Sequence, residues 1–348
     1  KDLFLADSIG RSPGASRSKA ETSAHCGVDP RKTAKQPHHA RMKGSVFSGF
    51  HRAKPGSESK RSGDERALRG KTAEDSYTAE NVILYQRRNI VGRIIAIANQ
   101  KGGVGKTTTA INLSACLAEI GQKVLTIDID PQGNTTSGLG VDKNATENNV
   151  YDLLLGECEI EECVVKTEID NQYLVASNVN LAGAEIELIG IEEKEYILRK
   201  QVSKVADQYD FIIIDCPPSL NMLTVNALTA ANTVLVPIQC EYYALEGLSQ
   251  LIHTIELVQE RLNPDLEIEG VVFTMYDART NLSLQVVENV KGYLHQNIYK
   301  TIIPRNVRLA EAPSHGLPIN LYDPRSAGAE SYRLLAQEVL HKGETEWQ

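Results

Sequence analysis

The sequence contains no uninterrupted run of 18 or more apolar residues, which excludes a membrane-spanning helix of ordinary length. Aromatic residues make up 5% of the chain and the tyrosines are scattered, so we expect no aromatic platform for single-stranded nucleic acid. The six cysteines include no Cys-x-x-Cys pair, and the interval from Cys158 to Cys163 fits no common zinc pattern. We therefore expect reduced thiols in a cytoplasmic protein.

Charge divides the chain into two parts. The net charge is −8, but residues 1–90 hold 18 lysines and arginines against 10 acidic residues, whereas residues 91–348 hold 19 against 35. The first part is rich in serine and glycine and has almost no apolar periodicity, so it cannot bury enough surface to offset the entropy of ordering. We predict that residues 1–90 form a disordered basic extension.

Three explanations of this extension stay open. It could be a basic arm that adds non-specific affinity for DNA. It could be a targeting peptide, although it lacks an apolar core of about seven residues or more. It could also be non-native sequence, translated from upstream of a natural start near Val91, because valine codons can initiate translation. We favour the third explanation.

The most informative segment is a glycine-rich turn between a predicted strand and a predicted helix. An apolar run over residues 94–98 leads into the turn, and a helical pattern follows from Ala110. Glycines let the backbone turn its N–H groups toward an anion, while a lysine and a threonine supply charge and a Mg²⁺ ligand. The sequence therefore predicts an ATP-binding phosphate loop made of Gly102, Gly103, Val104, Gly105, Lys106, Thr107 and Thr108.

Two lysines of this segment differ in their expected roles. Lys106 is predicted to reach the β- and γ-phosphates, with Thr107 on Mg²⁺ and Thr108 on the α-phosphate. The usual pattern has a glycine where Gln100 stands, and an extra lysine, Lys101, follows it. Lys101 could be a solvated surface charge, or it could reach the phosphates of a partner subunit, as an arginine finger does.

Carboxylates end two further apolar runs. Asp128 and Asp130 follow one run, and Asp215 ends another. Ligands bind at the carboxyl ends of the strands in open α/β sheets, so these acids should lie beside the phosphate loop. We predict that Asp215 holds Mg²⁺ through water, that Asp130 orients the attacking water and that Asp128 is structural. The segments 130–150 and 216–226 should respond to the γ-phosphate, the first of them as a mobile loop.

Apolar runs alternate with helical patterns, which predicts an α/β fold of the P-loop type, with a mostly parallel twisted sheet and helices on both faces. We assign residues 91–343 to this domain and residues 344–348 to a polar tail. The predicted strands are 93–98, 123–128, 173–176, 210–215, 233–237, 268–274 and 300–303. The predicted helices are 106–119, 148–155, 184–188, 192–207, 221–230, 244–262, 283–296 and 328–341.

From Gly92 onward the chain resembles the ParA/Soj family of partition ATPases, which have a deviant phosphate loop and are related to MinD. The matching segments are Lys101-Gly102-Gly103-Val104-Gly105-Lys106-Thr107, Asp128-Ile129-Asp130-Pro131-Gln132-Gly133-Asn134, Asp215-Cys216-Pro217-Pro218-Ser219, Tyr276-Asp277-Ala278-Arg279-Thr280-Asn281 and Ile303-Pro304-Arg305-Asn306-Val307-Arg308. Members typically begin just before the first strand, which supports a start near Val91.

The resemblance implies specific roles in a homodimer that sandwiches two ATP molecules. Lys101 would reach the partner's nucleotide, Gly102 would lie at the dimer seam, and Asp130 would be needed for hydrolysis. Pro304 and Asn306 match residues that contact adenine. Arg279 and Arg305 match arginines that bind DNA, and Arg308 belongs to the same basic cluster as Lys291, Lys300 and Arg305.

The sequence thus predicts an Mg²⁺-dependent ATPase that binds non-specific double-stranded DNA as an ATP dimer and is located at the nucleoid. The resemblance implies that a ParB-like partner stimulates hydrolysis, in chromosome or plasmid segregation. Two alternatives stay open: a MinD-like membrane-associated ATPase and a nucleotide-gated clamp with negligible turnover. The acidic C-terminus argues against membrane attachment, since that needs a basic amphipathic helix.

Overall fold

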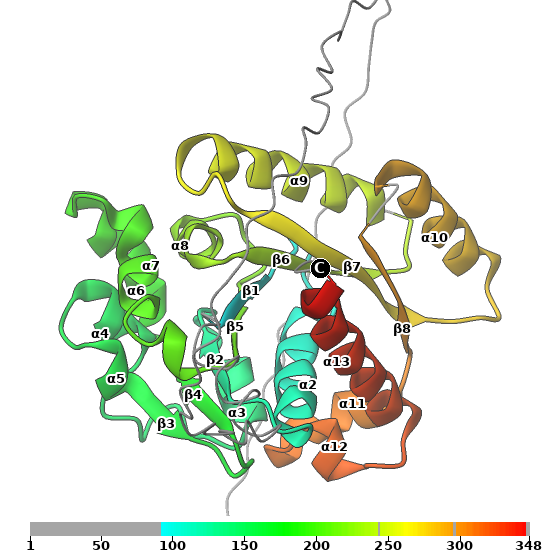
Figure 1. Ribbon diagram of the computed structural model, residues 1–348, viewed down its shortest axis with the longest axis horizontal. Helices are drawn as coiled ribbons and strands as arrows, with labels where there is room; N and C mark the ends of the chain where they lie inside the picture. The colour runs from blue at the N-terminus through cyan, green and yellow to red at the C-terminus, as the bar shows by residue number, and fades with distance from the viewer. Residues whose placement is uncertain (1–91, 243, 295–296, 346–348) are drawn as a thin grey trace, which may run out of the picture. The chain divides into compact units, whose positions relative to one another are not determined.

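The computed structural model describes residues 92–242, 244–294 and 297–345. The predicted extension 1–90 and residues 346–348 of the predicted tail lie outside these ranges. Within them, strands form one eight-stranded sheet in the order β3-β4-β2-β5-β1-β6-β7-β8 (Figure 1). Every neighbouring pair is parallel apart from β3 and β4. The predicted fold class is confirmed.

The strands agree with the predicted ones except at one edge of the sheet. β3 was not predicted because it has only three residues, and it pairs antiparallel with β4. The strands are β1 (Arg93–Ile97), β2 (Val124–Asp128), β3 (Val164–Lys166), β4 (Gln172–Val175), β5 (Phe211–Asp215), β6 (Thr233–Gln239), β7 (Glu267–Tyr276) and β8 (Ile298–Pro304).

The longer helices also follow the predicted pattern, whereas several short ones were not predicted. The helices are α2 (Lys106–Glu119), α3 (Asn134–Gly138), α4 (Val150–Leu155), α5 (Ile160–Cys163), α6 (Leu181–Glu187), α7 (Ile197–Val202), α8 (Met222–Ala230), α9 (Ala244–Arg261), α10 (Asn281–Leu294), α11 (Val307–Glu311), α12 (Ile319–Tyr322) and α13 (Ala327–Thr345). Since α13 continues to Thr345, the first residues of the predicted polar tail are helical.

Two predicted segments differ from the structure. The predicted helix 192–207 is broken into a 3-10 turn, α7 and a second 3-10 turn, and Glu193 before the first turn has a φ of 52° that an α-helix cannot accommodate. The predicted mobile loop after β2 contains α3, in which Thr135 and Thr136 are fully buried. Much of this segment is therefore folded against the core.

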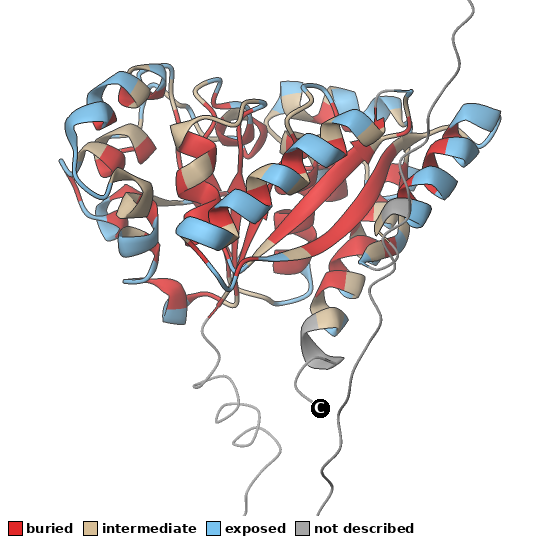
Figure 2. Ribbon diagram, turned by 90° about the horizontal axis from the view of Figure 1, so that it is seen from above, coloured by how far each residue is buried: buried red, intermediate tan, exposed pale blue. Residues whose placement is uncertain are grey.

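The sheet has a hydrophobic layer on each face, as expected for buried parallel strands. Along β1, Ile94 and Ala96 belong to the layer that includes residues of α4, α8 and α9, whereas Ile95 and Ile97 belong to the layer that includes residues of α2 and α13. Figure 2 shows the strands buried and the outward sides of the covering helices exposed. The sheet therefore holds the strand ends, and the loops that follow them, in fixed positions.

Candidate functional site

The central strands bring the predicted phosphate and metal residues to one edge of the sheet. β5 lies between β1 and β2, and Asp215 at its end is in register with Ile97 of β1 and Asp128 of β2. The glycine loop follows β1, and Asp130 follows β2. The phosphate loop therefore lies beside Asp215 and Asp130 at the carboxyl ends of these three strands. Ligands bind at this edge in open α/β sheets.

The loop has the backbone shape of an anion cradle. Gly103 and Gly105 have φ values of 75° and 92°, in the left-handed region that favours glycine. The hydroxyl of Thr274 in β7 donates to the carbonyl of Val104 at 2.7 Å and supports the loop from behind. Gly102 is different, because a side chain there would meet only Pro218, at 3.8 Å. Nothing within one described chain requires Gly102 to be small.

Lys106 begins α2 and its side chain is directed into the site. The residue is 6% exposed, and its Nζ donates to the carbonyl of Lys101 at 3.3 Å. Burial lowers the pKa of Lys106, while the nearby charges of Asp215 and Asp130 act in the opposite direction. The ammonium group is thus largely removed from water and held toward carboxylates, a position suited to binding a phosphate.

Lys101 lies in a different environment from Lys106. Its Nζ contacts Oε2 of Glu241 at 2.5 Å, and the two side chains are 29% and 45% exposed. Its backbone N–H donates to Oδ1 of Asn99 at 3.0 Å, and Asn99 in turn donates to the carbonyl of Pro237 at 2.8 Å. Glu241 was not predicted, although the rule that polar residues gather after parallel strands also applies to the end of β6.

Asp128 has the structural role that was expected for it. The carboxylate is fully buried and accepts hydrogen bonds from the backbone N–H and the hydroxyl of Thr136, both at 2.8 Å. It also accepts from the N–H of Asp130 at 3.2 Å. Burial raises the pKa of Asp128 to about 6 despite these bonds. Asp128 therefore fixes α3 to the end of β2.

Asp215 keeps one carboxylate oxygen without a protein partner. Its Oδ2 accepts from the hydroxyl of Thr135 at 2.7 Å, whereas Oδ1 is buried and has no hydrogen-bond partner within the described residues. Burial, followed by the charge of Asp128, raises the pKa of Asp215 to about 7, while the nearby hydroxyl groups of Thr135 and Thr107 oppose this rise. A buried carboxylate oxygen without a partner is costly, and a water bound to Mg²⁺ would give this one a hydrogen-bond donor.

This donor set fits Mg²⁺ bound together with a nucleotide. Thr107 and Asp215 provide a hydroxyl and a carboxylate close to each other, next to the loop. The described residues contain no group of three or more His, Cys, Asp or Glu side chains that could hold a metal alone. Mg²⁺ commonly uses one or two protein oxygens and completes its shell with water and phosphate.

Asp130 is bound to its own turn and to a segment that was not predicted. Its Oδ1 accepts from the N–H of Gln132 at 2.9 Å, and its carbonyl accepts from the hydroxyl of Ser177 at 2.7 Å. The N–H of Ser177 donates to the hydroxyl of Thr136 at 2.9 Å. The segment after β4 therefore holds the loop of Asp130 in place, a role that no local sequence signal indicates for Ser177.

Pro304 and Asn306 lie farther along the same sheet edge. Pro304 ends β8, and Asn306 caps α11 by accepting from the N–H of Arg308 at 2.8 Å. The chain then returns to the helix of the phosphate loop, since the N–H of Ile319 donates to Oδ1 of Asn112 in α2 at 2.7 Å. The structure thus gives both residues positions on the edge that carries the site.

The predicted DNA-binding arginines fall into two environments. Arg279 is exposed, and its guanidinium group donates two hydrogen bonds to Asp277, at 2.9 and 2.7 Å. The charge of Arg305 also acts on Asp277, and hydrogen bonds from Arg279 are the main reason why the pKa of Asp277 falls to about 2. Arg308 instead contacts Glu311 at 2.8 Å and Asp323 at 3.5 Å. The basic cluster is therefore mixed with acidic side chains.

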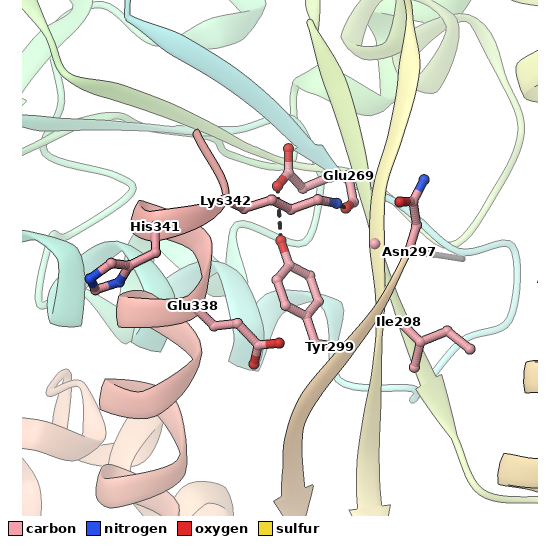
Figure 3. Close-up of a pocket in the computed structure, with 8 residues that line it drawn as sticks. Glu269, Asn297, Ile298, Tyr299, Glu338, His341 and Lys342 are labelled. Atoms are coloured by element: carbon pink, nitrogen blue, oxygen red, sulfur yellow. Dashed lines mark hydrogen bonds between the residues drawn. The ribbon is translucent and has the colours of Figure 1, made fainter. Parts of the chain in front are cut away.

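A separate pocket of about 340 Å³ lies where β7 and β8 begin, at the opposite end of the strands (Figure 3). Glu269, which lines it, is 3% exposed and accepts from the Tyr299 hydroxyl at 2.9 Å. Glu269 also contacts Arg93 at 2.9 Å, and the Lys342 ammonium group donates to its carbonyl. These contacts join β1, β7, β8 and α13. We therefore interpret the residues around the pocket as structural residues that hold these elements together.

The C-terminal helix packs as the sequence indicates. Tyr332, Leu335 and Val339 of α13 are buried in the layer that contains α2. No helix among the described residues combines the length and the apolar character needed to cross a bilayer.

Comparison with known proteins agrees with this geometry. A family model described as an AAA domain matches residues 92–268. The sporulation initiation inhibitor protein Soj of Bacillus subtilis is 59% identical over 253 residues, which is 73% of this chain and 100% of Soj. The chromosome partitioning protein ParA of Myxococcus xanthus is 53% identical over 252 residues, 72% of this chain and 89% of ParA.

Solved structures of similar proteins share the fold. Cobyrinic acid a,c-diamide synthase of Mycobacterium smegmatis, bound to an ATP analogue and magnesium, is 39% identical with a TM-score of 0.66, over 74% of this chain and 97% of its own. The cell division ATPase MinD of Pyrococcus furiosus is 29% identical with a TM-score of 0.59, over 72% of this chain and 99% of its own. The chain therefore belongs to the Soj/ParA family of chromosome-partitioning ATPases.

Proposed function

We propose that this ATPase works as a switch that closes into a homodimer on ATP and Mg²⁺, binds non-specific double-stranded DNA in that state, and is released by hydrolysis. The observation that carries the proposal is the contrast between two lysines of one loop. Lys106 is buried beside Asp215, whereas the side chain of Lys101 is partly exposed and forms an ion pair with Glu241. In this proposal Lys106 binds the phosphates of the chain's own ATP, and Lys101 can reach the ATP of a partner subunit.

The residues have the following roles in this proposal. The loop N–H groups and Lys106 bind the phosphates, and Lys101 reaches the γ-phosphate of the partner's ATP, where Gly102 allows close approach at the seam. Thr107 and, through water, Asp215 hold Mg²⁺, which withdraws charge from the phosphate oxygens. Asp130 orients the attacking water. Such a cation supplied by a partner can contribute about 10³–10⁵ in rate.

The DNA surface is proposed from Arg279 and Arg305, with a smaller part for Arg308. Residues 91–348 hold 19 basic against 35 acidic residues, so DNA binding needs a local basic patch. Dimerisation would double that patch. Because the proposed dimer forms only with ATP, DNA binding would then depend on ATP. Without base contacts, the logarithm of the affinity should fall with a slope of roughly −0.9 for each neutralised phosphate against the logarithm of salt concentration.

Family membership supports the remaining parts of the proposal. We propose that a ParB-like centromere-binding protein stimulates hydrolysis, that Pro304 and Asn306 contact adenine, and that the protein acts at the nucleoid. The apolar face of α13 is buried in the layer that contains α2, so this helix is not free for MinD-like membrane attachment.

ATP turnover, measured with and without double-stranded DNA and a ParB-like protein, tests the proposal. We expect slow turnover of the chain alone and faster turnover when both are added. Absence of turnover in every mixture would favour the nucleotide-gated clamp. Light scattering in ATP and Mg²⁺, with turnover blocked, tests the dimer directly, and a molecular mass of one chain would rule it out.

A further inference from the structure

Two cysteines outside the nucleotide site lie with their sulfur atoms 3.1 Å apart. Cys158 directly precedes Glu159, the N-cap residue of α5, and Cys163 is the last residue of that helix. Glu159 and Glu162 form a capping box at the N-terminus of α5. Residues in the positions of Cys158 and Cys163 commonly pack together across such a box, so the local fold holds the two thiols in contact.

The two thiols differ in access. Cys163 is fully buried and donates to the carbonyl of Glu159 at 3.5 Å, whereas Cys158 is 8% exposed. Both are free cysteines. Burial raises the pKa of both thiols, and the charge of Asp152 nearby adds to this effect. A small oxidant should therefore meet Cys158 first, and the reaction should be slow because little thiolate is present.

We propose that Cys158 and Cys163 form a reversible disulfide when the protein meets hydrogen peroxide. The Cys158 thiol loses its proton and attacks one peroxide oxygen, the O–O bond breaks, and a sulfenic acid and one water form. The Cys163 sulfur then attacks the Cys158 sulfur, the S–O bond breaks, and the hydroxyl leaves with the Cys163 proton as a second water. Two thiols give up two electrons, and one peroxide accepts them.

The geometry requires only a small movement. The sulfur atoms must approach from 3.1 Å to about 2 Å, the length of a disulfide bond. The ring that closes contains only α5 and the two residues before it, Cys158 and Glu159. A cysteine pair with this proximity can complete the second step faster than a second peroxide reaches the sulfenic acid.

The disulfide would stabilise one edge of the sheet. Glu159, the N-cap residue of α5, forms an ion pair with Lys204, which lies just beyond the end of α7, and β3 begins immediately after Cys163. β3 pairs with β4, and β4 leads to Ser177, which donates to the carbonyl of Asp130 at 2.7 Å. Oxidation should therefore slow local opening of α5 and β3, beside the segment that holds the loop of Asp130.

The test maps the thiols of the full chain after limited peroxide treatment, denaturation and alkylation. Cleavage after Lys143 and Lys166 yields a peptide, 144–166, that contains both cysteines. We expect this peptide to escape alkylation and to weigh about 2 Da less than its reduced form, because two hydrogen atoms are lost. A thiol reductant should restore alkylation, and the buried Cys116 in α2 should remain alkylated throughout.

Two outcomes of the thiol mapping would contradict the proposed disulfide. The proposal is wrong if another cysteine oxidises before this pair, or if Cys158 is converted to sulfinic acid without a cross-link. The variant Cys163→Ser should accumulate a sulfenic acid on Cys158 that a dimedone probe captures, whereas the wild-type chain should not. If that variant does not fold, the mapping of the wild-type chain still decides the question.

Discussion

The ammonium group of Lys101 lies 2.5 Å from Oε2 of Glu241 in the same chain. Lys101 follows β1 and Glu241 follows β6, the neighbouring strand, so the ion pair joins two adjacent strand ends. Since both side chains are partly exposed, the pair is worth about 1 kcal/mol or less. A phosphate group carries more charge than one carboxylate and can therefore displace Glu241 from Lys101.

Glu241→Gln should make dimerisation easier. The substitution removes the charge that competes for Lys101 in both subunits, so the protein concentration needed for half-dimerisation in ATP should fall by up to about thirtyfold, the equivalent of two exposed ion pairs of about 1 kcal/mol each. ATP affinity of the single chain should not change. Analytical ultracentrifugation in ATP and Mg²⁺ measures the effect, with Glu246→Gln on α9 as the matched control. A higher dimerisation threshold would mean that Glu241 supports the dimer.

Asp130→Ala should retain ATP and stop its turnover. The substitution removes the carboxylate proposed to orient water but leaves Lys106 and Asp215 in place. We expect a loss of at least about 10²-fold in the hydrolysis rate, the usual contribution of a positioned acid or base. Phosphate release and nucleotide retention check this. Asp142→Ala, on the same connection, should hydrolyse ATP normally, and equal activity of both variants would exclude Asp130 from the mechanism.

Arg305→Glu should weaken DNA binding more than Arg308→Glu. Arg308 is already paired with Glu311 and Asp323, whereas Arg305 is exposed beside a carboxylate that Arg279 neutralises. Titration of a DNA duplex at several salt concentrations should give a smaller salt slope for Arg305→Glu, by roughly 0.9 for each phosphate that the variant no longer neutralises. Arg199→Glu on α7 is the control. An unchanged slope for Arg305→Glu would place the DNA surface elsewhere.

Glu269→Gln should destabilise the fold at neutral pH by about 3 kcal/mol, because it leaves the Arg93 charge without its buried partner. Burial alone would raise the pKa of Glu269, but Arg93 outweighs it, together with Thr233, Lys342 and Tyr299, and the pKa falls below 4.5. The folded chain therefore binds fewer protons here than the unfolded chain. The stabilisation is present above pH 4.5 and is lost as the pH falls through the folded-state pKa.

Urea unfolding of wild type and variant at several pH values checks this expectation. The difference in free energy of unfolding should be largest near pH 7 and should shrink in acid. Glu267→Gln changes an exposed acid in the same strand and should show no such difference. A difference that stays constant with pH would indicate a packing defect and not the removal of a charge.

Much of the site could be predicted from the sequence because its groups occur in local motifs. The phosphate loop combines a strand, glycines, Lys106 and a helix in direct succession, so neighbouring residues determine its shape. The same reasoning identified Asp215, since an acid at the end of an apolar strand is a local pattern. Within the described residues Asp215 Oδ1 has no hydrogen-bond partner, and the role of Asp215 in holding Mg²⁺ stays a prediction.

Other features depend on contacts between distant segments. The segment after β2 looks like a loop because it is rich in Gly, Asn and Thr, but Asp128 accepts two bonds from Thr136 and holds it as a helix. Ser177 lies 47 residues from Asp130, and Glu241 lies 140 residues from Lys101. Composition and periodicity describe single segments, so they cannot indicate which distant segments meet.

The order of the strands places the residues proposed for ATP hydrolysis in one half of the sheet and several surface residues in the other half. The adjacent ends of β2, β5 and β1 carry Asp130, Asp215 and the phosphate loop, while β6, β7 and β8 lead to Glu241, Asp277 and Asn306. Apart from Thr274 and Glu241, which contact the phosphate loop, changes in the second half can reshape the surfaces that face other molecules without touching Asp130 or Asp215. Attempts to redirect what this protein recognises should therefore begin in that half, at surface positions that do not contact the phosphate loop.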